Sequence, residues 1–394
     1  MKILFVAMPF SIHTVRWINQ LENLGWEIHF FPSYPYADIH PMLKEVYYHE
    51  YLHSIKTENK KLKFVPILPF EIKVKNKIAR KIIGKLYRIL RFEKSRVDTL
   101  NKVIQKIKPN VIHSLESQAA GYQLSQVKAK YGLKAKWIHS TWGIDLHFFG
   151  MLEKHKSQLK LLFKNLDTFI AEGQRDIELA RNIGFNKVQY IFPSVGGGFK
   201  TENIDIDNYE KTSNRKIILL KGTQDIVRRS LVALRALERC IDLLTDYEII
   251  IYNCEESVKI AAEIFKSKHK INIQILEESS HETMLQYNQK ARLSITTNLS
   301  DGLPNTFLEA MLYGAFPIQS NTSMANEWID NGKTGFLVHP EDSDDIEIAI
   351  KKALLDNELV DNAAQINHKT IKTLLNYDDI KNKVIEMYKN EVVK

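Results

Sequence analysis

Residues 300–338 read SDGLPNTFLEAMLYGAFPIQSNTSMANEWIDNGKTGFLV, and this segment indicates the fold more clearly than the rest of the chain. It follows an apolar run, turns through Gly302 and Pro304, and begins a helix near Asn305 or Thr306. The helix ends at Gly314, before another apolar run. A strand, a turn and a helix N-terminus together form an anion site, because backbone N–H groups and the helix dipole converge there. The segment therefore predicts an α/β fold with a phosphate-binding turn.

Two acids flank this turn. Asp301 lies at its mouth, and Glu309 lies eight residues later, one turn into the helix. Ionised carboxylates only accept hydrogen bonds, so they suit the paired hydroxyl groups of a ribose or a sugar. A phosphate site beside two such carboxylates suits a nucleotide-sugar. The structural alternative is that the first acid caps the helix and Glu309 is a solvated helical residue.

The spacing Asp301-x7-Glu309, followed by AMLYGAFPI and NGKTGFLV, resembles the acidic pair and flanks of the retaining GT-B glycosyltransferases of family 4. The first acid of that family is usually Glu, and this chain has Asp. The resemblance implies that Glu309 binds the donor ribose and that Asp301 meets the sugar hydroxyls. It also implies that the backbone approaches sugar and phosphate along the residues Gly302, Leu303, Pro304, Asn305 and Thr306.

A second family signature is a strand that ends in Gly and Arg, with a basic residue at the start of the next helix; both cations bind the diphosphate. Residues 219–237, LLKGTQDIVRRSLVALRAL, resemble it. Gly222 matches and Thr223 occupies the usual Arg position, while Arg228 and Arg229 stand at the helix start. Lys221 is a candidate for the missing charge. Two arginines at a helix N-terminus oppose the dipole, which favours a functional role over surface decoration.

The whole chain has the pattern of two doubly wound domains. Its 394 residues exceed one ordinary core, and 44% hydrophobic with 26% charged residues exclude a disordered chain. We expect an N-terminal Rossmann-like acceptor-side domain at 1–195, a linker at 196–215, a Rossmann-like donor domain at 216–376, and a helix at 377–394 returning to the first domain. The GT-B fold implied by the resemblance places the two domains across a cleft. The expected strands are Lys2–Ala7, Glu27–Phe31, Asn110–Ser114, Lys136–Ser140, Thr168–Ala171, Val188–Phe192, Ile217–Leu220, Glu248–Tyr252, Asn272–Leu276, Leu293–Thr297, Phe316–Gln319 and Gly335–Val338.

The first domain has polar and aromatic segments after its strands, which is typical of a ligand-binding edge. They are PFSIHTVRW with Ser11 and His13, SLESQAAGY with Glu116, and HSTWGIDLHFF with Trp142, Gly143 and Asp145. The last resembles a family segment in which a His-Gly pair precedes an acid, with Trp142 at the His position. His13, His139 and Asp145 are candidates to contact the acceptor, and the alternative is that they are structural. Glu172, Arg175 and Asp176 follow another strand, either as site residues or as helix caps.

Charge is concentrated between residues 54 and 96, where 14 Lys+Arg face three Asp+Glu. Lys75–Phe92 has helical spacing, with an apolar stripe surrounded by cations. It predicts either contact of 73–96 with an anionic membrane or a helix packed on its own sheet. Asp205 and Asp207 have the DxD spacing of a metal site, and we interpret them as solvated linker residues.

These patterns together predict a retaining glycosyltransferase of the hexosyl or N-acetylhexosaminyl class. It would move a sugar from a nucleotide-diphosphate sugar to a saccharide or lipid-linked saccharide acceptor, in surface polysaccharide or glycolipid synthesis. The catalytic candidates are Asp301, Arg228, Arg229 and Asp145, with no metal or other cofactor required, since the cations and the helix N-terminus stabilise the leaving diphosphate. Two cysteines and no long apolar stretch favour a cytoplasmic protein, with peripheral membrane contact through 73–96. The alternatives are a sugar-nucleotide epimerase or hydrolase, or a protein that binds nucleotide-sugar or nucleic acid without catalysis; no recognisable reading element favours nucleic acid.

Overall fold

The computed structural model describes residues 1–34, 37–50, 52–53, 62–67, 72–73, 79, 82, 94–193, 197–277 and 279–393. The chain forms two compact units. Unit 1 consists of Met1–Gly198 with Asp378–Lys394, and unit 2 consists of Phe199–Tyr377. Most of the basic segment 73–96, including nearly all of the helix expected at Lys75–Phe92, lies outside the described residues.

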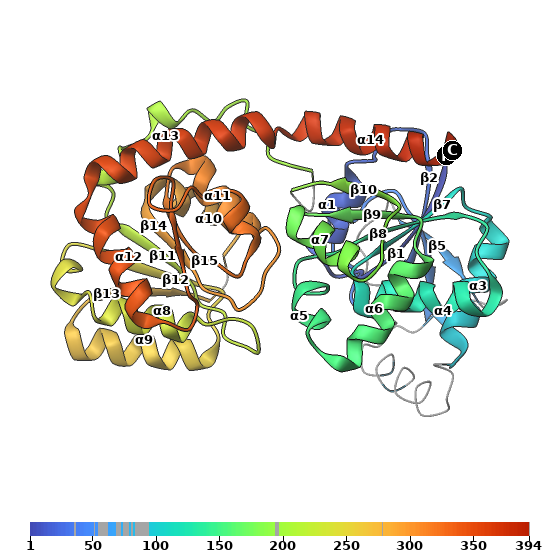
Figure 1. Cartoon of the computed structure of the whole chain (residues 1–394), viewed down its shortest axis with the longest axis horizontal. Coiled ribbons are helices and arrows are strands. Elements are labelled where there is room, and N and C mark those ends of the chain that lie inside the picture. Colours follow the sequence, from blue (N-terminus) through green and yellow to red (C-terminus); the bar gives the residue numbers. More distant parts are fainter. Residues whose placement is uncertain are drawn as a thin grey trace. The chain divides into compact units, whose positions relative to one another are not determined.

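Unit 1 contains an eight-stranded parallel sheet of order β10-β9-β8-β7-β1-β2-β3-β5 (Figure 1). Its strands are β1 Lys2–Ala7, β2 Glu27–Pro32, β3 Tyr47–Glu50, β5 Lys63–Pro66, β7 Val111–Leu115, β8 Lys136–Ser140, β9 Thr168–Ala171 and β10 Val188–Ile191, and a separate pair is formed by β4 Leu52–His53 and β6 Ile72–Lys73. The helices of this unit are α1 Ile12–Asn19, α3 Lys94–Ile107, α4 Tyr122–Tyr131, α5 His147–Gly150, α6 Glu153–Asn165, α7 Gln174–Asn182 and α14 Tyr377–Val393, with a π-helical turn η1 at Ser117–Gly121.

The six strands expected in this half are present to within a residue or two. Four more, β3, β4, β5 and β6, were not expected. Strand β3 reads YYHE and buries His49 and Glu50 at 2% and 8% exposure. A strand with buried polar residues lacks the apolar run that marks a parallel strand. Helix α1 ends at Asn19, because residues 20–23 form turns and Asn23 has φ 66°.

Unit 2 contains a six-stranded parallel sheet of order β13-β12-β11-β14-β15-β16. Its strands are β11 Ile217–Lys221, β12 Glu248–Tyr252, β13 Asn272–Leu276, β14 Ala291–Thr296, β15 Phe316–Ser320 and β16 Phe336–Val338, and its helices are α8 Ser230–Glu238, α9 Glu256–His269, α10 His281–Lys290, α11 Asn305–Tyr313, α12 Ser343–Leu355 and α13 Asn357–Leu374. Helices α8, α9 and α12 pack on one face of the sheet, and α10 and α11 pack on the other. This layered α/β arrangement confirms the predicted fold class.

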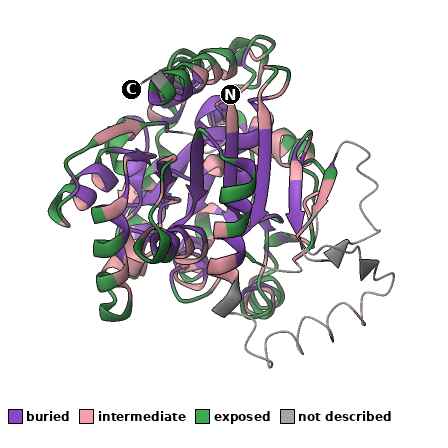
Figure 2. Ribbon diagram, turned by 90° about the vertical axis from the view of Figure 1, so that its right-hand side faces the viewer, coloured by how far each residue is buried: buried purple, intermediate pink, exposed green. Residues whose placement is uncertain are grey.

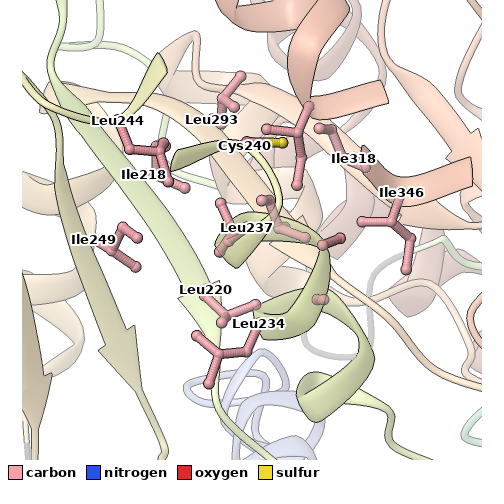
Figure 3. Packing of buried hydrophobic residues seen from close by; sticks show 14 of the residues in the cluster. Ile218, Leu220, Leu234, Leu237, Cys240, Leu244, Ile249, Leu293, Ile318 and Ile346 are labelled. Atoms are coloured by element: carbon pink, nitrogen blue, oxygen red, sulfur yellow. The ribbon is translucent and has the colours of Figure 1, made fainter. Parts of the chain in front are cut away.

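The core of unit 2 consists of branched aliphatic side chains (Figure 3). Ile218 and Leu220 from β11 meet Leu234 and Leu237 from α8, and Cys240 is buried among them. Cys240 and Cys254 are both free thiols. Figure 2 shows the pattern of burial along the chain: the strands are mostly buried, and the outer faces of the helices are exposed. Burial of the central strands, such as β1, β7 and β14, explains their near-continuous apolar sequence.

Residues 199–215, expected as part of a linker, belong to unit 2. Arg215 is 2% exposed, and its Nη1 donates to Tyr313 O at 3.0 Å, at the C-terminal end of α11. Thr212 Oγ1 donates to Gly314 O at 2.7 Å. These donors satisfy carbonyl groups that the end of a helix leaves unpaired. The segment therefore holds the C-terminal end of α11.

Helix α14 is attached to unit 1 by a buried polar contact. The hydroxyl of Tyr388 accepts from Trp17 Nε1 at 2.8 Å and lies 2.5 Å from His113 Nδ1. Burial lowers the pKa of His113 far below its usual range, so the ring is neutral and accepts the hydroxyl hydrogen. In the part of the chain that the structure describes, no helix has both the length and the hydropathy to cross a bilayer.

Candidate functional site

The turn between β14 and α11 is stabilised by its own polar groups. Asn298 Nδ2 donates to Asp301 Oδ2 at 2.8 Å, and Gly302 N donates to Asp301 Oδ1 at 2.9 Å. Met324 N donates to Gly302 O at 3.1 Å, which fixes the turn from the side of the following loop. Gly302, Leu303 and Pro304 are buried, whereas Asp301 remains partly exposed. The turn is therefore held by internal hydrogen bonds, and its acid is partly exposed.

Helix α11 begins at this turn without a side-chain cap in the described residues. Pro304 occupies the N-cap position and makes no side-chain hydrogen bond, and its carbonyl accepts from Phe307 N at 3.0 Å and Leu308 N at 3.2 Å. Asn305 and Thr306, the first two helical residues, are partly exposed. A helix N-terminus carries partial positive charge and favours an anion, which is the geometry expected of the phosphate-binding turn.

Glu309 does not match the structural alternative of a solvated residue, because it is 3% exposed. Its Oε1 lies 2.7 Å from Nε2 of His281, the first residue of α10. A carboxylate only accepts hydrogen bonds, so Nε2 carries the hydrogen. Sequence reasoning missed His281, which stands 28 residues from Glu309 at the start of the helix that follows β13, outside both signature segments.

The loop after β11 brings cations to the same turn. Arg229 N donates to Thr297 O at 2.9 Å, and Leu299 N donates to Val227 O at 2.7 Å, so the loops after β11 and β14 pair side by side. Lys221 is the last residue of β11, which pairs with β14, so it lies at the sheet edge from which both loops leave. Burial lowers the pKa of Lys221, while the charges of Asp301 and then Glu309 act in the opposite direction.

The two arginines have different partners. Arg228 Nη1 lies 2.6 Å from Asp225 Oδ2, and Arg229 Nε lies 3.0 Å from Glu341 Oε1. Arg228 lies opposite Asn298, whose side-chain amide donates to Asp301, and its charge also acts to lower the pKa of Lys221. Each arginine is thus paired with a carboxylate, and Arg228 is the one that lies beside the turn that carries Asp301.

Close packing around Gly222 leaves room only for glycine. A Cβ at this position would lie 2.7 Å from Ile251 Cγ2 and 2.9 Å from Cys254 Cα, too close for any side chain. Its N–H donates to Tyr252 O at 2.8 Å. Thr223, at the position of the usual family arginine, uses its carbonyl to accept from Ser230 Oγ. The glycine therefore holds β11 close to β12 at the edge where the cations gather.

Unit 1 has a buried pair of carboxyl groups after β7 and β8. Glu116 has φ 74° and accepts from Ala119 N and Ala120 N in the η1 turn at 2.9 and 2.6 Å. Asp145 accepts from Ser117 N at 2.9 Å and Trp142 N at 2.7 Å. Burial raises the pKa of each carboxyl to about 7, and their mutual repulsion contributes to the shift of Glu116.

A chain of hydrogen bonds ends on Asp145. Trp137 Nε1 donates to Ser114 Oγ at 2.8 Å, so the Ser114 hydrogen is directed to His139 Nδ1 at 2.8 Å. Nε2 of His139 then donates to Ser117 Oγ at 3.1 Å, and Ser117 Oγ donates to Asp145 Oδ2 at 3.0 Å. Burial lowers the pKa of His139 to about 3, so its ring is neutral, as this sequence of donors requires. His139 therefore has a structural role.

The remaining acceptor-side candidates surround Trp142. Ser11 caps α1 by accepting from His13 N at 3.2 Å, and the His13 ring lies 5.6 Å from the Trp142 ring. Trp142 Nε1 is buried and has no hydrogen-bond partner among the described residues. Gly143 has φ 77°, which favours glycine, and its carbonyl accepts from Arg175 Nη2 at 3.4 Å.

The acidic pair that we discounted is engaged in local structure. Asp205 caps a short 3-10 helix by accepting from Asp207 N at 3.2 Å, and Asp207 accepts from Gln365 Nε2 at 3.0 Å. Within the described ranges, no three His, Cys, Asp or Glu side chains gather as metal ligands.

Comparison with known proteins agrees with this architecture. Residues 2–173 match the family model described as glycosyl transferase 4-like, and residues 201–370 match glycosyl transferases group 1. No curated protein matches the chain.

Several solved structures share the fold over the full length. Sucrose-phosphate synthase from Thermosynechococcus elongatus has 14% identity and a TM-score of 0.69, over 99% of this chain and 98% of that one. A glycosyltransferase from Rickettsia africae has 16% identity and a TM-score of 0.68, over 100% and 98%. HepE of Anabaena, solved with UDP and glucose, has 14% identity and a TM-score of 0.68, over 99% and 100%. The chain therefore belongs to the GT-B glycosyltransferases, with a glycosyl transferase 4-like N-terminal half and a glycosyl transferases group 1 C-terminal half.

Proposed function

We propose that this chain transfers a sugar from a nucleotide-diphosphate sugar to a saccharide or lipid-linked saccharide, with retention of the anomeric configuration. The observation that carries the proposal is the cluster at the start of α11. It combines a buried carboxylate, a partly exposed acid and two cations beside a helix N-terminus that lacks a side-chain cap in the described residues. Retention is inferred from the family resemblance of the acidic pair.

Each part of the donor has a complementary group in unit 2. Glu309 Oε2 accepts from a ribose hydroxyl, while Asp301 accepts from a hydroxyl of the transferred sugar. The diphosphate lies against the N-terminus of α11, where Lys221 and Arg228 add positive charge. A carboxylate that is already buried loses little further hydration when the ribose binds, so the contact favours binding.

The chemical difficulty is the negative charge that develops on the leaving diphosphate. The bond between the anomeric carbon and the phosphate oxygen breaks as the acceptor oxygen bonds to that carbon, and the acceptor proton passes to the departing phosphate. Lys221, Arg228 and the N-terminus of α11 stabilise the charge that develops, because preorganised charges need no rearrangement during the reaction. In the proposed reaction, no step uses a metal ion.

The acceptor binds to unit 1 in this proposal. Trp142 offers an aromatic face beside His13 and an indole N–H that has no partner among the described residues. Sugars suit such a site, because their C–H faces stack on aromatic rings while their hydroxyls accept hydrogen bonds. Asp145 holds the Trp142 backbone and is surrounded by internal donors, so we assign it a positioning role. We place the reaction in the synthesis of a surface polysaccharide or glycolipid.

The test begins with a panel of nucleotide-sugars, including UDP-glucose, with which HepE was solved. Binding at 100 times the dissociation constant raises stability by about 2.7 kcal/mol, which a thermal-shift assay detects. The selected donor is then incubated with and without oligosaccharide acceptors, and release of nucleoside diphosphate is followed. Acceptor-dependent release supports a transferase, acceptor-independent release indicates a hydrolase, and binding without release indicates a sensor. Failure of every donor to bind would refute the proposal.

A further inference from the structure

Glu309 is held by His281, which lies outside the two signature segments, residues 219–237 and 300–338. His281 Nε2 donates to Oε1 at 2.7 Å, and no other hydrogen bond to the Glu309 carboxylate is found among the described residues. The two side chains differ in environment, since that of Glu309 is 4% exposed and that of His281 is 54% exposed. The histidine therefore stands at the solvent boundary of the donor site, and the acid lies inside it.

This contact makes the two carboxylate oxygens unequal. Oε1 is occupied by the imidazole N–H, which fixes the rotation of the carboxylate group. Oε2 is then the atom that remains to accept from a ligand. A buried carboxylate with no donor is costly, and a single fixed donor meets part of that cost while leaving one oxygen available.

The start of α10 places the histidine firmly. Ser280 caps the helix by accepting from Thr283 N at 3.1 Å, and His281 is the first residue after that cap. Helix α10 packs on α11, which carries Glu309. Two packed helices thus define the distance between the imidazole and the carboxylate.

We propose that His281 is a positioning residue for recognition of the donor ribose: by occupying Oε1 of Glu309, it directs Oε2 toward one ribose hydroxyl. The inference rests on the proposed function and adds a residue to its donor site. Because His281 acts through Glu309, its loss affects binding of ribonucleotides more than binding of deoxyribonucleotides.

The experiment is calorimetric titration of the full chain with UDP and with 2′-deoxy-UDP and 3′-deoxy-UDP, for the parent and for His281→Leu, His281→Gln and Glu309→Ala. His269→Leu is the matched control, because His269 Nε2 makes a similar contact with Glu238 Oε1 at 3.0 Å at the end of α9. The parent prefers UDP to one deoxy form by roughly 10- to 100-fold, as expected for a hydrogen bond to a charged group. We expect His281→Leu to reduce that preference about tenfold, because its affinity for UDP falls while its affinity for the deoxy forms changes little. His281→Gln retains the preference, because its amide N–H replaces the imidazole N–H.

The outcomes separate this inference from the proposed function. If Glu309→Ala loses the ribose preference and His281→Leu retains it, the role of His281 is refuted and the donor site stands. If His281→Leu weakens UDP and both deoxy forms equally, or if His269→Leu has the same effect, the contact is only structural. If Glu309→Ala binds UDP as the parent does, or if the parent binds none of UDP, GDP and ADP, the donor site fails, and the inference fails with it.

Discussion

The carboxyl pair of unit 1 makes stability depend on pH in an unusual direction. Burial raises the pKa of Asp145 from 3.8, and that of Glu116 from 4.5, to about 7. Between about pH 4 and pH 7 the folded state therefore binds more protons than the unfolded chain, and the free energy of unfolding falls as pH rises through this window. At 1.36 kcal/mol per pKa unit, each carboxyl removes about 2.5 kcal/mol of stability between pH 5 and pH 8.

The perturbation that tests this reasoning is Asp145→Asn. The amide has no charge to desolvate, so the contribution of Asp145 disappears, and the repulsion that raises the pKa of Glu116 disappears with it. Urea denaturation at pH 5, 6, 7 and 8 is followed by tryptophan fluorescence. This signal reports mainly on unit 1, which contains Trp17, Trp26, Trp137 and Trp142, with Trp328 in unit 2.

We expect the decrease in stability between pH 5 and pH 8 to be smaller in Asp145→Asn than in the parent by about 2.5 kcal/mol or more. Glu116→Gln provides an independent variant of the same pair with the same expected direction. The surface variant Asp98→Asn keeps the parental dependence between pH 5 and pH 8, because the hydrogen bond from Lys130 holds the pKa of Asp98 below its usual range. Equal pH dependence in the parent and both carboxyl-pair variants would refute the reasoning.

Three further predictions concern the backbone, the cofactor requirement and the membrane. Gly222→Ala lowers the free energy of unfolding by about 1–3 kcal/mol, because the new Cβ would lie 2.9 Å from Cys254 Cα. Gly150→Ala is the control and leaves the melting temperature nearly unchanged, because its Cβ would lie 3.8 Å from Leu159 Cδ1. Turnover persists in excess EDTA, and loss of activity with recovery on adding manganese would reverse the account of the leaving group. The chain sediments with vesicles of acidic lipid at low salt and is released as salt rises, since each cation near the membrane contributes about 1 kcal/mol. We expect charge reversal of four cations to abolish that sedimentation and to preserve transfer to a soluble acceptor; the four are Lys77, Lys81, Lys85 and Arg88. Unchanged sedimentation of this variant would refute the membrane prediction.

The regular elements and the donor turn were accessible from the sequence for a physical reason. Parallel strands buried on both faces must be apolar throughout, so β1, β12 and their neighbours stand out as short hydrophobic runs. The turn at Gly302 and Pro304 is equally visible, because turn residues and a helix start are local signals. These features depend on residues that are close in sequence.

The parts that sequence reasoning missed depend on distant contacts. In β3, Nε2 of His49 lies 2.8 Å from Nδ1 of His29, and both histidines are buried. A strand with such a polar residue lacks the apolar run by which a buried strand is recognised. His281 reaches Glu309 only because α10 packs on α11. Arg215 lies in a segment with the composition of a linker, yet it is buried and holds the end of α11. Such pairings become visible only once the helices and strands are placed in space.

We infer that the start of α11 and the loop after β11 hold the nucleotide-sugar. Amide hydrogen exchange of the full chain, with and without saturating UDP-glucose, can be resolved to peptides that cover residues 221–231 and 297–309. We expect the ligand to slow exchange in both peptides, and Glu309→Ala to abolish the effect at the same ligand concentration while its unliganded exchange matches that of the parent. Protection confined to other segments, or equal protection in Glu309→Ala, would contradict it.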